Sequence, residues 1–254
     1  MPISKLSLIS LLAFPLFAQE PATETPVATD AASAKQKEEP KTLQLGQRVN
    51  GELTLVDIDG KPQNAHKLMG KITVVNFYSI QCPIQRAWDG RLAAIQGDFE
   101  KDGVVFLHID SNHTEIGKEP QQTEGDAKPY ANVREHLTKQ KLPFRVLLDH
   151  GNKVADLFDA QATPHVYVFG KDGKLVYKGL VDDDQKDRRA GERNDYLRDT
   201  LAQLLKGEKV EPFETKAVGC SIKRLPKAGA GEGQRQGQGR GRGGRRQREG
   251  GGGR

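Results

Sequence analysis

The chain has 254 residues, and its 39 Lys and Arg side chains against 34 Asp and Glu give a net charge of +5. Residues 226–254 hold eight of the basic side chains and two acids, so this segment carries 8 − 2 = +6 and residues 1–225 carry 5 − 6 = −1. The basic charge therefore belongs to the end of the chain. Residues 1–225 are nearly neutral, so a folded domain within them lacks the positive charge that nucleic-acid binding requires.

The first 18 residues have the pattern of a signal peptide. Lys5 precedes an apolar run at 6–17, and Ala18 is the expected cleavage position. The run is too short to span a bilayer as an anchor. We therefore expect export to the periplasm or cell envelope, without stable membrane insertion after cleavage.

Two further segments lack the large apolar residues that a core requires. Residues 19–42 are mostly Pro, Ala, Thr, Glu and Lys, which indicates a disordered linker. Residues 226–254 are mostly Gly, Arg and Gln, which indicates a disordered basic tail. Residues 43–225 remain for one α/β domain.

Within this domain, apolar runs typical of buried strands alternate with helical patterns. After residue 82, apolar side chains recur every three or four positions over about twenty residues, which predicts a helix. In chain order the patterns predict strands at 53–58 and 72–77, a helix from 83 to about 102, a strand at 104–109, a polar loop at 110–126, a helix at 130–140, a strand at 144–148, a helical turn at 153–158, a strand at 166–169, a turn at 171–174, a strand at 175–178 and a helix at 193–205.

This order predicts a three-layer α/β fold with a central mixed sheet flanked by helices. Parallel strands joined by helices make its centre, and the hairpin at 166–178 supplies an antiparallel pair at one edge. Cys82 lies where the buried strand meets the helix, and Pro83 suits the first helical position. Unpaired N–H groups at a helix N-terminus stabilise a thiolate, so Cys82 is a candidate nucleophile. The alternative is a small, buried core residue.

The element order, with Cys82 after the core strand and Thr163-Pro164 before the hairpin, resembles the thioredoxin-like superfamily. Residues 76–83, 163–169, 175–179 and 214–223 resemble the bacterial redoxins related to alkyl hydroperoxide reductase and thiol-specific antioxidant (AhpC/TSA) proteins. The resemblance implies that Cys82 attacks a peroxide or a disulfide substrate, with a thiol as electron donor. It also implies a cis Thr163–Pro164 bond, with Pro164 shaping the substrate groove, and no organic cofactor or metal.

The chain departs from its relatives near Cys82. Gln85 stands where classical thioredoxins have a second cysteine, which excludes a CxxC dithiol. Ser79 fits the hydroxyl that peroxiredoxins use to hydrogen-bond the peroxide and the thiolate, but Val75 replaces their proline. Their arginine on the facing strand is also missing. Arg86 either supplies a positive charge one turn beyond Cys82 or points to solvent.

Cys220 is the second of the two cysteines and lies after the last predicted helix, in a position that we expect to be flexible. It is either the thiol that resolves an intermediate on Cys82 or half of a permanent structural disulfide in a non-catalytic module.

The histidines and the basic tail are each candidate binding elements. His108, His113 and His165 lie at or near strand ends but lack a standard ligand spacing, so we expect no metal site. The basic tail resembles RNA-binding RGG segments. In an exported protein its expected partners are anionic envelope polymers, acidic lipid headgroups or extracellular DNA, which leaves an envelope-binding role as an alternative function. The other interpretation is a solvated tail without a partner.

Overall fold

The computed structural model describes residues 42–226 except 52 and 190, and these belong to one compact unit, Pro40–Arg254. The predicted signal peptide, linker and basic tail lie outside the described residues, apart from Thr42 and Pro226 at their boundaries.

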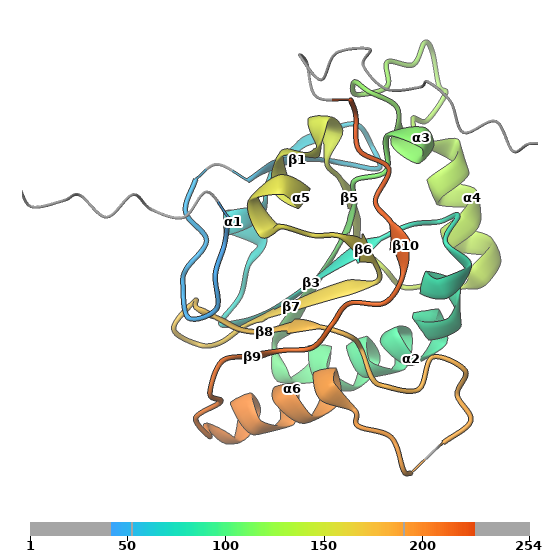
Figure 1. Ribbon diagram of the computed structural model, residues 1–254. Coiled ribbons are helices and arrows are strands. Elements are labelled where there is room, and N and C mark those ends of the chain that lie inside the picture. Colours follow the sequence, from blue (N-terminus) through green and yellow to red (C-terminus); the bar gives the residue numbers. More distant parts are fainter. Residues whose placement is uncertain (1–41, 52, 190, 227–254) are drawn as a thin grey trace, which may run out of the picture. The chain divides into compact units, whose positions relative to one another are not determined.

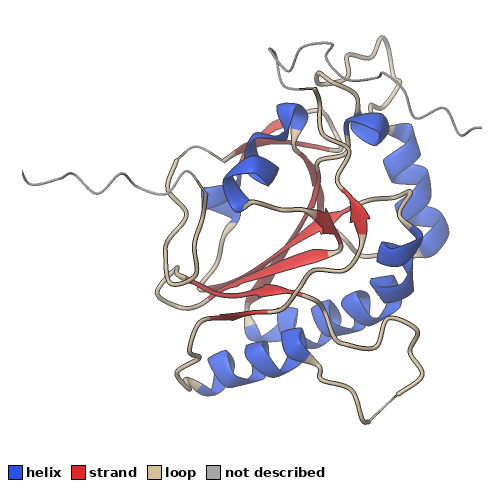
Figure 2. Ribbon diagram, viewed as in Figure 1, coloured by secondary structure: helices blue, strands red, loops and turns tan. Residues whose placement is uncertain are grey.

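A mixed sheet forms the centre of the described domain (Figures 1 and 2). Its eight strands in the described residues run in the order β2-β1-β5-β4-β3-β7-β8-β9. The central strand β3 pairs in parallel with β4 and antiparallel with β7. Their bounds are β1 Thr54–Asp57, β2 Pro62–Asn64, β3 Ile72–Tyr78, β4 Val104–Asp110, β5 Val146–Leu148, β7 His165–Phe169, β8 Leu175–Gly179 and β9 Phe213–Glu214.

A second, two-stranded pairing lies beside this sheet. Strand β10 (Cys220–Ser221) pairs antiparallel with β6 (Ala162–Thr163), and the register places Cys220 opposite Thr163. Figure 1 shows the end of the described chain, coloured red-orange, running past β6. A cysteine that is distant in sequence is thereby fixed beside the segment that enters β7.

Helices cover both faces of the sheet. The helices α2, α4 and α6 pack on one face, and α1 and α5 pack on the other. The bounds are α1 Ala65–Leu68, α2 Pro83–Phe99, α3 His113–Ile116, α4 Ala131–Gln140, α5 Lys153–Phe158 and α6 Tyr196–Lys206, with 3₁₀ turns η1 Glu100–Asp102 and η2 His150–Asn152. No helix in the described ranges combines the length and hydropathy that a membrane span needs.

Two cores follow from the alternation of side chains along β3. Val74 faces the core that contains Trp88 of α2, whereas Phe77 faces the other core and Phe158 of α5. Both faces of β3 are apolar because both are covered. Burial of a side chain as large as that of Trp88, which is 1% exposed, contributes about 3 kcal/mol. The end of β3, where the nucleophile candidate follows, is therefore buried on both faces of the sheet.

The predicted element order and the α/β fold class are confirmed, with four differences. The strand predicted at 144–148 begins at Val146, and the last helix begins at Tyr196 rather than 193. The loop predicted at 110–126 contains the short helix α3. The flexible position predicted for Cys220 is wrong, because the backbone of this residue pairs with β6.

Candidate active site

Cys82 is the N-cap of α2, with extended backbone angles (φ −78°, ψ 114°), and Pro83 opens the first turn. The backbone N–H of Gln85 donates to its Sγ atom at 3.2 Å, so the sulfur satisfies one of the unpaired donors of the helix. The residue is only 2% exposed. The helix start that the sequence predicts is confirmed, and it places the thiol at the positive end of a 17-residue helix.

The segment before β7 contacts the other side of the thiol. The Cys82 Sγ–H group donates to the carbonyl oxygen of Thr163 at 3.1 Å. The Thr163–Pro164 peptide bond is cis, as predicted. Thr163 therefore lies directly against Cys82 and also forms the strand pair with Cys220.

Cys220 lies across from Cys82. Both cysteines are free thiols, and the side chain of Cys220 hydrogen-bonds Cys82. The approach is tight because Gly219 lies on the Thr163 backbone, where a Cβ atom would be only 2.3 Å from the Thr163 carbonyl oxygen. A side chain at position 219 has no room, so glycine is what lets Cys220 reach the site.

The two thiols have opposite acidities. Burial alone would raise the pKa of Cys82, but hydrogen bonds from the Cys220 and Thr163 side chains and from the Gln85 N–H lower this pKa below its ordinary value. Burial, together with the neighbouring Cys82, raises the pKa of Cys220. Cys82 is therefore the more readily formed thiolate, and Cys220 keeps its proton.

Ser79 holds the turn before Cys82 rather than the thiol itself. Its hydroxyl oxygen accepts the backbone N–H of Cys82 at 3.0 Å. Its single proton goes to the Glu115 carboxylate at 2.5 Å, a length typical of a charge-assisted bond. The predicted hydroxyl donor to a peroxide or thiolate is thus directed to Glu115 in this structure. The Ile80 N–H also donates to Glu115, at 2.8 Å.

The residues from Gly219 to Leu225, here called the C-terminal strap, are anchored along their length. The Lys223 N–H donates to the Asn112 side chain at 3.0 Å, and the Ile222 N–H donates to the Gln161 carbonyl at 3.2 Å. Arg224 forms an ion pair with Asp156 at 2.8 Å. Asn112 also donates to the Tyr78 carbonyl, so the same side chain links the strap to the end of β3.

A small cavity of about 180 Å³ opens onto both thiols. It takes its walls from the turn before α2, from the segment that contains α3, and from the strap. The lining residues are Ser79, Gln81, Cys82, Asn112, Thr114, Glu115, Cys220, Ser221 and Lys223. The cavity gives a small molecule access to the sulfur atoms of Cys82 and Cys220.

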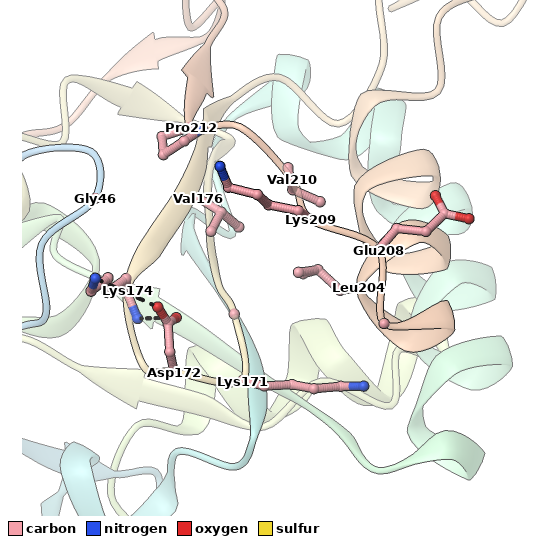
Figure 3. Close-up of a pocket in the computed structure, with 12 residues that line it drawn as sticks. Gly46, Lys171, Asp172, Lys174, Val176, Leu204, Glu208, Lys209, Val210 and Pro212 are labelled. Atoms are coloured by element: carbon pink, nitrogen blue, oxygen red, sulfur yellow. Dashed lines mark hydrogen bonds and ion pairs between the residues drawn. The ribbon is translucent and has the colours of Figure 1, made fainter.

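A second cavity, of about 390 Å³, lies away from the cysteines, between the β7–β8 turn and the end of α6. Figure 3 shows Val176, Leu204 and Val210 converging in it and Lys174 beside Asp172, with which it forms an ion pair at 3.8 Å. No cysteine lines it, so thiol chemistry belongs to the smaller cavity.

His108, one of the candidate metal ligands, lies in the core of the domain. His108 is fully buried within β4, and burial lowers its pKa to about 3. Its ring hydrogen-bonds the side chains of Asn76 and Gln96, as expected of a neutral core histidine. Within the described residues, no group of three or more His, Cys, Asp or Glu side chains is placed to hold a metal ion. Arg86 is exposed.

The sequence interpretation missed Glu115, Asp110 and Asn112. All three lie at or just after the end of β4, in the segment 110–126, for which the sequence predicts only a polar loop. Their position in the sequence could have identified them. The carboxyl ends of neighbouring parallel strands lie at the same edge of a sheet, so residues after the end of β4 lie close to Cys82, which follows the end of β3.

The chain is similar to two groups of known proteins, which are curated relatives and solved structures. Thiol-disulfide oxidoreductase ResA of Bacillus cereus is 22% identical over 149 residues, which cover 59% of this chain and 76% of the relative. The protein of the same name from Bacillus anthracis is 21% identical over the same length.

Among solved structures, an uncharacterized conserved protein from Geobacillus kaustophilus has 29% identity and a TM-score of 0.62, covering 74% of this chain and 95% of its own. A hypothetical protein from Sinorhizobium meliloti 1021 shares the fold, with 24% identity, a TM-score of 0.58 and coverage of 72% and 96%. The predicted thioredoxin-like fold is confirmed. A family model described as AhpC/TSA family matches residues 45–178, more than half of the chain. The chain belongs to the AhpC/TSA family.

Proposed function

We propose that this chain is a thiol oxidoreductase in which Cys82 and Cys220 form one redox pair that cycles between dithiol and disulfide. The observation that carries the proposal is the pairing of Cys220 with Thr163, which holds the second thiol against Cys82 on a shared cavity. Family membership and the names of the curated relatives support the same class of reaction.

The chemistry runs in two steps. The Cys82 thiolate attacks one sulfur of a disulfide RSSR and forms Cys82–S–S–R, and RS⁻ leaves. The Cys220 thiol then loses its proton and attacks the Cys82 sulfur, which releases the second RS⁻ and leaves a Cys82–Cys220 disulfide. Two electrons pass from the protein to the substrate, and a dithiol donor restores the pair.

The order of attack follows from acidity. Thiolate is the attacking species, and the pKa of Cys82 is lowered while that of Cys220 is raised. The lower pKa also makes Cys82 the better leaving group when a donor thiol reduces the disulfide.

The substrate class follows from the cover over Cys82. With 2% of the residue exposed and the strap in front of it, a bulky protein disulfide does not reach the sulfur, whereas a small disulfide fits the cavity of about 180 Å³. The second candidate is peroxide reduction, which the same small cavity also admits. It is the weaker one because the Ser79 proton is committed to Glu115.

The experiment mixes the reduced full chain with hydroxyethyl disulfide or with hydrogen peroxide and follows thiol loss and intact mass. We expect both thiols to disappear with the small disulfide, and Cys220→Ser to stop at a mixed disulfide on Cys82. A sulfenic acid trapped in Cys220→Ser, with no reaction toward the disulfide, would favour the peroxidase. An inert Cys82 in both assays would support a non-catalytic module.

Export and the tail belong to the same proposal. The run at 6–17 followed by Ala18 supports a signal peptide, and the +6 charge of residues 226–254 supports contact with anionic envelope polymers. Cell fractionation with and without residues 226–254 tests both: we expect a periplasmic protein that loses envelope retention when the tail is deleted. A cytoplasmic location would contradict export, and unchanged envelope retention without residues 226–254 would contradict binding through the tail.

A further inference from the structure

Two buried carboxyl groups face each other beside the thiol cavity. Asp110, at the end of β4, is fully buried, and Glu115 of α3 is 6% exposed. The Oδ1 atom of Asp110 accepts the backbone and side-chain N–H groups of Asn112, but its Oδ2 atom has no donor among the described residues. Two carboxylates without a donor between them repel each other, so this pair holds a proton.

That proton resides on Asp110. Burial and the adjacent Glu115 raise the pKa of Asp110 well above its ordinary value. Glu115, in contrast, accepts from Ser79 and Ile80, which are the contacts of a carboxylate. The site thus contains a proton donor and a proton acceptor within one pair.

Glu115 shares the cavity with both thiols. The volume of about 180 Å³ exceeds the roughly 30 Å³ that a water molecule occupies, so one water can connect the carboxylate to either sulfur. Asp110 does not line the cavity and reaches it only through Glu115.

The resolving step of the proposed function needs such a group. Cys220 keeps its proton because its pKa is raised, yet only its thiolate attacks the Cys82 sulfur. The departing RS⁻ from an alkyl disulfide in turn takes up a proton. No other carboxylate among the described residues lines this cavity.

We propose that Glu115 is the proton-transfer residue of the resolving step: its carboxylate accepts the proton of the Cys220 thiol and returns it to the leaving group. The S–S bond between Cys82 and the substrate sulfur breaks as the Cys82–Cys220 bond forms, and RSH departs with the proton that Cys220 carried. Asp110 holds Glu115 in place and supplies the shared proton of the pair. This inference rests on the proposed function and names the proton path within it.

The titratable and charged groups around Glu115 come from every neighbouring element. They are Asp110 of β4, Tyr78 of β3, Cys82 and Arg86 of the α2 terminus, His136 of α4, Cys220 and Lys223 of the strap, and His113 on α3 itself. A pH profile of the whole reaction therefore reports several groups at once, and the pH dependence of the resolving phase is measured separately from that of the first phase.

The test uses reduced full-length protein and two small disulfides, dipyridyl disulfide and hydroxyethyl disulfide. Release of the first thiol reports attack by Cys82, and release of the second reports resolution by Cys220. In Glu115→Gln we expect the rate constant of the first phase to stay within about twofold of the wild-type value and that of the second phase to fall by about 10²-fold. The loss should be larger for hydroxyethyl disulfide, because an alkyl thiolate needs the returned proton and an aromatic one does not.

Glu119→Gln is the matched control, because it removes an exposed carboxylate four positions further along the chain that does not line the cavity. We expect its second phase to stay within about threefold of wild type. An unchanged second phase in Glu115→Gln overturns the inference, as does an equal loss in both variants. A first phase that is absent in wild type would instead refute the proposed function.

The wild-type pH profile decides the question if Glu115→Gln does not fold. With a carboxylate base, resolution remains fast well below the pKa of Cys220. Without one, its rate falls tenfold for each pH unit below that pKa, and this result overturns the inference.

Discussion

We predict that the contact between Gly219 and Thr163 controls the rate at which Cys82 and Cys220 form a disulfide. In Gly219→Ala the new Cβ atom would lie 2.3 Å from the Thr163 carbonyl oxygen, 2.7 Å from its carbonyl carbon and 3.0 Å from its nitrogen. Ordinary contacts require about 3.5 Å, so the strap must move by about 1 Å. These atoms are backbone, and they cannot rotate away as a side chain would.

A shift of about 1 Å takes the next residue, Cys220, out of position. Disulfide formation needs Cβ atoms within about 3.5–4.5 Å of each other. A 1 Å misplacement of a reacting group costs about 10²-fold in rate, equivalent to about 2.7 kcal/mol. We expect the resolving phase of Gly219→Ala to be slower by this factor, while attack by Cys82 is nearly unchanged.

The assay follows release of the first and second thiol from hydroxyethyl disulfide by quenching and intact mass. Gly97→Ala is the matched control, because Gly97 is exposed in α2 and a Cβ atom there meets nothing within 4 Å. It should leave both phases unchanged and stabilise the helix by about 1 kcal/mol. Wild-type resolution in Gly219→Ala would refute the reasoning, since Cys220 would then not depend on the β10–β6 register.

Three further predictions concern stability and the return reaction. The pKa of His108 is about 3 in the folded chain and about 6.5 in the unfolded chain, so the unfolded chain binds the proton first and the free energy of unfolding falls as the pH drops from 6.5 towards 3. In urea unfolding, the free energy of unfolding of His108→Gln should fall by about 1.4 kcal/mol less per pH unit in this window than that of wild type. Equal slopes for the two proteins would contradict the assignment. Asp182→Ala removes the buried acceptor of Trp88 Nε1 and Arg91, so it should cost about 3 kcal/mol in urea unfolding, and a loss under about 1 kcal/mol would show that the pair contributes little. In the oxidised protein a small donor thiol should be trapped on Cys220, which is half-buried and leaves the more acidic Cys82 as leaving group, whereas an adduct on Cys82 would reverse the proposed direction.

Local patterns were enough to predict the nucleophile and its setting. The β3 run, Pro83 at the first helical position and the spacing of Trp88 and Leu92 specify the strand–Cys82–helix junction, because both periodicities and the cap act within a few residues. Thr163-Pro164 was placed by its position before a recognisable hairpin.

What the sequence could not predict depends on contacts across the chain. Cys220 was found by counting cysteines, but its strand pairing with Thr163 joins residues 57 positions apart and leaves no local pattern. Asn112 meets Lys223 across 111 positions, so its role in anchoring the strap is visible only in the fold. Glu115 was hidden for the same reason, because a four-residue helix is too short to give a periodic signal.

The most direct test of the account is disulfide mapping of the full chain during a redox titration with dithiothreitol, with Cys82→Ser and Cys220→Ser alongside. We predict one two-electron transition in which a monomer loses both thiols and yields a single Cys82–Cys220 peptide adduct. Each single variant should lack this transition. Oxidation that joins two chains, or a chain whose Cys82 remains a thiol when Cys220 is oxidised, would contradict the claim that these two residues form one redox pair.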